Sequence, residues 1–201
     1  RYAPDGLELD WMRFGYHFRP GKEAEGVLIL NQFMREVRSL TKQWSAKRGH
    51  PIKLGARVPT LPDAAKGLGM DGVTWVREGL VDMLVPTPFW ATTDFDVPIE
   101  LWRERIGSAA KKAILAPGAE ILVRAYPAAK PIETDLTSTR GFAAAAWQRG
   151  ADSIYLFNYM DPGPMTGGKD AYRTLLEEGL SLKTVTRKPR RHVVTYRDTV
   201  A

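Results

Sequence analysis

Apolar and acidic residues alternate near the start of the chain. Leu7 and Leu9 alternate with Glu8 and Asp10, directly after a Pro-Asp-Gly turn. A period of two is typical of a β-strand and places the two acids on one face and the leucines on the other. A strand covered by helices on both sides should be apolar on both faces. We therefore expect the two acids to serve chemistry at the carboxyl end of this strand.

Further apolar segments of strand length follow, and segments of helical periodicity separate them. Strands are predicted at residues 52–59, 80–88, 120–127 and 152–159, and helices at 23–47, 71–79, 98–112, 137–148 and 170–182. The segment 80–88 is almost continuously apolar, as a buried parallel strand should be. The alternation of strand and helix predicts an α/β fold with a parallel sheet and crossover helices.

Polar residues distinguish between the two parallel folds that fit this pattern, an open doubly wound sheet and an eight-stranded barrel. A dinucleotide-binding open sheet would need a GxGxxG turn after its first strand, and the sequence has none. Polar residues instead follow the predicted strand ends: Asp10 and Arg13, Arg57, Trp90 with Asp94, Tyr126, and Asn158 with Tyr159 and Asp161. One rim that carries the polar residues is typical of a (β/α) barrel.

The first strand also resembles a known motif. Residues 5–10, Asp-Gly-Leu-Glu-Leu-Asp, resemble the fourth strand of α-amylase-type glycoside hydrolases, in which the final Asp is the nucleophile. Residues 5–14 resemble more closely the DGIHLDYIRYP strand of glycosyl-hydrolase-like proteins, although His or Arg often stands there where this chain has Glu8. Residues 157–161, FNYMD, resemble an eighth strand of such enzymes.

The resemblance covers about residues 1–185 and implies a partial (β/α)8 TIM barrel, approximately strands four to eight with their helices. Residues 186–201 would then begin a C-terminal β segment or linker, with a strand at 193–196. The chain opens on a strand without an initiator Met, so we expect it to be part of a longer protein. Five strands cannot close a small barrel, and the open edges should make this part insoluble or oligomeric unless the missing N-terminal half is supplied.

The resemblance implies hydrolysis of a glycosidic bond in an oligo- or polysaccharide, which needs one ionised and one protonated carboxyl group. Asp10 is the candidate for the ionised group, as nucleophile or base. Arg13 or Arg57 nearby would favour its charged form.

The protonated partner stays open at this point. Asp94 and Asp96 follow the strand at 80–88, among aromatic residues that could desolvate one of them. Glu8 competes because it lies on the same strand face as Asp10, and either a catalytic role or a hydrogen bond to substrate would suit it. An acid outside this chain is the remaining alternative.

Aromatic and amide side chains at the same strand ends are candidates for sugar binding. Trp90, Tyr126 and Tyr159 could stack on sugar rings, and Asn158 could bind a hydroxyl group. Trp11 shares a face with the leucines of the first strand, which favours a place in the core.

Composition narrows the alternatives further. The 201 residues carry a net charge of +6 and include no cysteine, which excludes disulfides and thiolate metal sites. The basic residues are scattered, without a nucleic-acid-binding signature, and no apolar run reaches the roughly 20 residues of a membrane span. The three histidines form no metal-binding pattern, so we expect neither a metal nor a cofactor. The compartment stays open, and export to the periplasm or the outside is one alternative.

Two other functions fit the same pattern. A barrel could bind carbohydrate without cleaving it. A metabolic barrel could instead bind a sugar phosphate through Gly167, Gly168 and Lys169, which follow the last predicted strand.

Overall fold

A computed structural model describes residues 3–197 of the chain, except 13, 90, 161, 162 and 164. The fold is mixed α/β with a parallel sheet, as predicted. The sheet has the strand order β1 (Gly6–Asp10), β2 (Lys53–Pro59), β3 (Met83–Thr87) and β4 (Ile114–Leu115). A second parallel pair joins β5 (Gly118–Glu120) to β8 (Tyr155–Phe157). β6 (Leu122–Val123) and β7 (Ile132–Glu133) form an antiparallel pair.

β4 and β5 connect these parallel units into one row. Only Ala116 and Pro117 separate the two strands, and their backbone groups continue the pairing on either side. The Ala116 N–H donates to the Leu84 carbonyl at 3.0 Å, and the Pro117 carbonyl accepts from the Tyr155 N–H at 3.1 Å. Proline lacks an N–H and therefore interrupts a ladder without ending the strand direction. The strand order of the whole row is thus β1, β2, β3, β4/β5 and β8.

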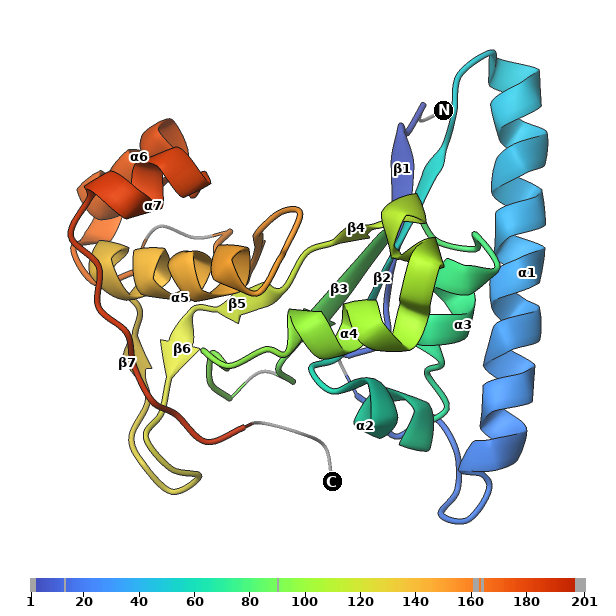
Figure 1. The fold of residues 1–201 in the computed structure, drawn as a ribbon, viewed down its shortest axis with the longest axis horizontal. Helices are drawn as coiled ribbons and strands as arrows, with labels where there is room; N and C mark the ends of the chain where they lie inside the picture. The colour runs from blue at the N-terminus through green and yellow to red at the C-terminus, as the bar shows by residue number, and fades with distance from the viewer. Residues whose placement is uncertain (1–2, 13, 90, 161–162, 164, 198–201) are drawn as a thin grey trace.

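Helices lie between successive strands of this row along the chain, and further helices follow its last strand, β8 (Figure 1). They are α1 (Glu23–Arg48), α2 (Pro62–Gly67), α3 (Gly72–Arg77), α4 (Ile99–Ile106) with the 3₁₀ helix Gly107–Lys112, α5 (Leu136–Gln148), α6 (Gly168–Glu178) and α7 (Leu182–Arg187). Local chemistry sets several of their ends. Gly49 ends α1 in a left-handed conformation, and Asp135 begins α5 with a capping box that includes Ser138. None of the helices described here is both long and apolar enough to cross a membrane.

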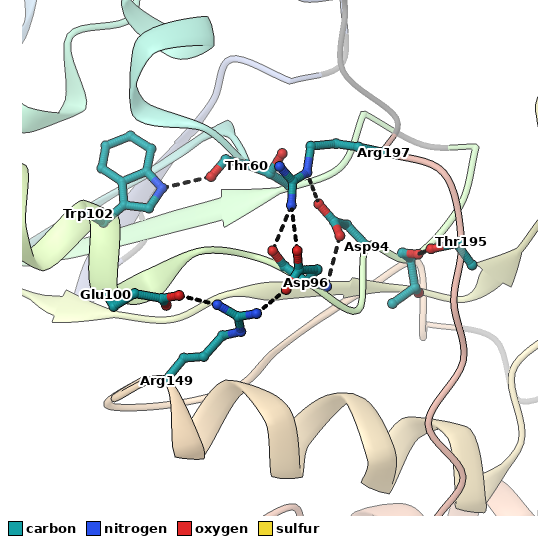
Figure 2. Close-up of polar contacts among 9 residues, drawn as sticks. Thr60, Asp94, Asp96, Glu100, Trp102, Arg149, Thr195 and Arg197 are labelled. Carbon is teal, nitrogen blue, oxygen red and sulfur yellow. Dashed lines mark hydrogen bonds and ion pairs between the residues drawn. The ribbon is translucent and has the colours of Figure 1, made fainter.

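The core lies between the row of strands and these helices. Leu54 and Leu84 project from the sheet and are fully buried against Trp75 and Trp102 of the helices. The Trp102 indole N–H donates to the Thr60 carbonyl at 2.8 Å, which fixes α4 against the end of β2 (Figure 2). Leu54 and Leu84 therefore face the helices, and the residues that alternate with them are left for the opposite face.

Two predictions about the fold were wrong. The strand expected at 120–127 runs instead from Ile114 to Glu120, interrupted at Pro117, because the apolar residues after Glu120 belong to the β6–β7 hairpin. Residues 193–196 form no strand; they pack back against the loop after β3. The partial barrel stays a prediction: no closed barrel is seen among the described residues, where β1 and β8 each pair on one side only.

Candidate functional site

One face of the sheet carries the polar residues that the helices do not cover. Strand register places Asp10 beside Arg57, and Glu120 beside Phe157. Glu8 and Tyr155 precede them by two residues on their strands and therefore share this face. We call the set Glu8, Asp10, Arg57, Glu120, Tyr155, Phe157 and Asn158 the polar face. Its residues come from β1, β2, β5 and β8, with Asn158 directly after β8.

Arg57 joins the two sides of the polar face. Its side chain is buried, and its Nη1 donates to Asp10 Oδ2 at 2.6 Å. The guanidinium carbon lies 3.5 Å from the ring centroid of Phe157, in a cation–π contact. Asp10 Oδ1 accepts the Met12 N–H at 2.9 Å, and the side chain remains partly open to solvent. Asp10 is thus an accessible carboxylate held in place by a buried cation.

Glu120 lies in the opposite environment, because it is fully buried. Burial raises the pKa of this carboxyl to about 7. Four interactions lower the pKa but do not outweigh burial: the hydrogen bond from Asn158, the N–H groups of Ile121 and Leu122, and the charge of Arg57. Asn158 Nδ2 donates to both carboxyl oxygens, at 3.1 and 3.0 Å. To do so Asn158 adopts a left-handed backbone with φ of 62°, a conformation that asparagine tolerates better than most residues.

A hydrogen bond connects the two ends of the strand row. The Tyr155 hydroxyl of β8 donates to Glu8 Oε1 of β1 at 2.9 Å. Burial, followed by this bond to Glu8, raises the pKa of Tyr155 to about 12, so the phenol stays protonated. Since β1 and β8 are the outermost strands of the row, the row must curve toward the polar face for this contact to form.

Asp94 and Asp96, which the sequence suggested as proton donors, belong to a different network (Figure 2). Asp94 is buried and accepts from Arg197 Nε at 2.7 Å, while its other oxygen accepts the Asp96 N–H at 2.8 Å. Asp96 is exposed and pairs with Arg149, which also contacts Glu100. Among the contacts of the described residues, none joins either aspartate to Asp10.

The remaining predicted residues divide between the site and other places. Arg57 and Asn158 lie on the polar face, as expected. Tyr126 is exposed in the turn between β6 and β7, and Tyr159 is buried with its hydroxyl 2.8 Å from Thr134 Oγ1. Neither belongs to the polar face. The predictions for Arg13 and Trp90 fall outside the described residues.

Sequence reasoning missed three residues of the polar face: Glu120, Tyr155 and Phe157. A signal for Glu120 was present, since it is the lone charged residue between Lys112 and Arg124. It was overlooked because the predicted strand began at Glu120 instead of ending there. For Tyr155 the sequence holds no signal, because its partner Glu8 is distant along the chain.

A cavity of about 820 Å³ opens at the other end of the strands. Its lining includes Gly6, Glu8, Lys53 and Ile114 from the strands, and Arg103 from α4. Arg103 is already paired with Asp152 at 2.7 Å. The titratable residues with contrasting environments lie at the carboxyl ends instead, and we place the candidate site there. No group of three or more potential metal ligands occurs in the part of the chain that the structure describes.

The loop suggested for phosphate binding begins α6. Gly167 and Gly168 take left-handed conformations there, and Lys169 is exposed in the first helical turn. Asp170 occupies the same turn and would repel an anion.

Comparison with known proteins adds no assignment: no family model matches the chain, and no curated protein matches it either.

Proposed function

We propose that this chain carries the site of a carbohydrate-active hydrolase that cleaves a glycosidic bond with two carboxyl groups. Asp10 is the ionised carboxylate, acting as nucleophile or as base on water, and Glu120 is the proton donor. The observation that carries the proposal is the contrast between them on one face. Asp10 is accessible and paired with Arg57, whereas Glu120 is buried and keeps its proton to about pH 7.

The sequence suggested Asp94 or Asp96 as the proton donor, whereas this proposal assigns that role to Glu120 at the end of β5. A general acid must be protonated at working pH and near the reacting bond. Asp94 is engaged in an ion pair with Arg197 at 2.7 Å. Arg57 relates the two carboxyl groups, since it contacts Asp10 directly and its charge acts on Glu120.

The proposal includes a fold expectation, that the strand row is the C-terminal portion of a (β/α)8 barrel. The curvature implied by the Tyr155–Glu8 contact, and the position of the polar groups at the carboxyl ends, both support it. A small barrel needs about eight strands. The remaining strands would then come from the rest of a longer protein or from a second copy.

The decisive experiment uses aryl glycosides whose leaving groups differ in acidity, with the full-length protein. Glu120→Gln should lower kcat about 10²–10⁴-fold for poor leaving groups and much less for dinitrophenyl glycosides, which need no proton. Asp10→Asn should abolish turnover of both. Asp63→Asn, an exposed carboxylate paired with Arg105 and with the same change of charge, is the matched control and should retain activity. Unchanged hydrolysis by Asp10→Asn would refute the proposal.

One observation favours a second candidate, a carbohydrate-binding barrel without catalysis. Both oxygens of Asp10 already accept hydrogen bonds, from Arg57 and from the Met12 backbone, so a purely structural role fits them. A binding protein of this kind would retain glycan in an equilibrium assay after Asp10→Asn and would release no product in either form.

A further inference from the structure

The segment of residues 191–197, which we call the strap, returns from the last helix to the loop after β3. It has neither helix nor strand and lies beside α5 (Figure 1). The Arg191 N–H donates to the Thr137 carbonyl at 2.9 Å. A Cβ atom on Gly141 of α5 would stand 2.0 Å from the Arg191 carbonyl oxygen. The strap therefore packs so closely against α5 that the helix needs a glycine at position 141.

The far end of the strap is fixed by side chains (Figure 2). Thr195 Oγ1 donates to the Thr93 carbonyl at 2.8 Å. Arg197 Nε donates to Asp94 Oδ2 at 2.7 Å, and its Nη2 donates to the Asp96 carbonyl at 2.7 Å. Asp94 is only 3% exposed. Removal of the cation would leave a buried carboxylate unpaired, which is strongly unfavourable.

The loop held by the strap is bonded in turn to the segment that carries Glu120. Thr93 Oγ1 donates to the Glu120 carbonyl, and the Thr93 N–H donates to the Leu122 carbonyl at 2.7 Å. Thr92 Oγ1 accepts the Arg124 N–H at 2.9 Å. These bonds fix the backbone of residues 120–124, and that backbone includes the two N–H groups that approach the Glu120 carboxyl.

We propose that Thr195 and Arg197 are positioning residues of the candidate site, because they hold Thr93, and through it the backbone beneath Glu120, in place. Asp94 then serves as the anchor of the strap. The catalytic consequence rests on the proposed function, whereas the positioning itself does not. Arg57 of β2 and Tyr159 after β8 are the charged and titratable groups that act electrostatically with Glu120, and neither belongs to the strap.

The test is the titration of Glu120 in the full chain without substrate, followed by carbon NMR of carboxyl-labelled glutamate and assigned with Glu120→Gln. Arg197→Gln should loosen the loop, admit water to Glu120 and lower its titration midpoint by at least half a pH unit. Thr195→Val, which changes no charge, should move it in the same direction by less. Arg149→Gln is the matched control, because it removes another cation from Asp96 and makes no bond to the strap; its midpoint should stay unchanged.

The test does not depend on a single variant. If Arg197→Gln does not fold, Thr195→Val and Gly141→Ala carry the test, since the latter displaces the strap from α5. A Glu120 midpoint that stays constant in folded strap variants would overturn the proposal, as would an equal shift in Arg149→Gln. Because no substrate is used, failure here is distinguishable from failure of the hydrolysis assay with Asp10→Asn.

Discussion

The buried carboxyl of Glu120 should make the stability of this protein fall as the pH rises. In the folded state its pKa is about 7, whereas the ordinary value for a glutamate is 4.5. Between these two pH values the unfolded chain has already released the proton that the folded chain keeps. Unfolding therefore becomes progressively easier across this interval. The stabilising contribution is complete below pH 4.5 and is lost as the pH passes 7.

The magnitude follows from the separation between the two pKa values. Each pKa unit corresponds to 1.36 kcal/mol, so ionisation of Glu120 should cost about 3 kcal/mol of folding free energy once the pH exceeds 7. Glu120 is fully buried, which leaves little solvent screening to reduce this figure. For comparison, a whole domain is stable by about 5–15 kcal/mol.

Urea denaturation from pH 4.5 to 8.5 can isolate this contribution if Glu120→Gln is measured in parallel. The variant stays neutral, so the difference in unfolding free energy between variant and parent should move by about 3 kcal/mol in favour of the variant. Effects of the substitution that do not depend on pH, such as altered hydrogen bonds to Asn158, cancel when this difference is compared between pH values. Two pH profiles that run parallel would refute the account of Glu120 as a neutral acid.

Two further predictions concern the packing of the polar face. Gly118→Ala places a Cβ 2.5 Å from the buried hydroxyl of Thr87, and thermal unfolding should show a loss of about 1–3 kcal/mol in stability. Gly67→Ala is the control, because its Cβ would meet nothing within 4 Å, and it should show no loss of stability. Arg57→Lys forfeits the stacked guanidinium and should cost about 2 kcal/mol in urea denaturation. Arg35→Lys, in an exposed ion pair, should change little, and equal losses in the two lysine variants would contradict this account.

The sequence predicted the succession of strands and helices well, because that succession depends on local periodicity. The helix predicted at residues 137–148 differs from α5 by one residue at its start, and the strand at 52–59 differs from β2 by one. The error at 120–127 concerns Pro117 and Gly118, two residue types that are uncommon inside a strand. In the structure Pro117 interrupts the ladder, and Gly118 makes room for Thr87 on the neighbouring strand. Both are tertiary reasons that periodicity cannot reveal.

The candidate site was predictable only in part. The face of Glu8 and Asp10 followed from the period of two, and the pairing of Asp10 with Arg57 followed from their places at two strand ends. The role of Asp94 did not, because its partner Arg197 lies about a hundred residues later in the chain. Burial of Glu120 also depends on how the strand row curves, which no single segment determines.

Three ionised carboxyl groups on one face would repel each other, but the three carboxyl groups of the polar face have different environments. Asp10 is neutralised by Arg57, and Glu8 accepts a hydrogen bond from a phenol that stays protonated. Glu120 is buried and accepts hydrogen bonds from Asn158, and it keeps its proton up to about pH 7. The packing that buries Glu120 thus sets this carboxyl apart from the other two. The protonated carboxyl group that glycoside cleavage requires would therefore come from the burial of Glu120.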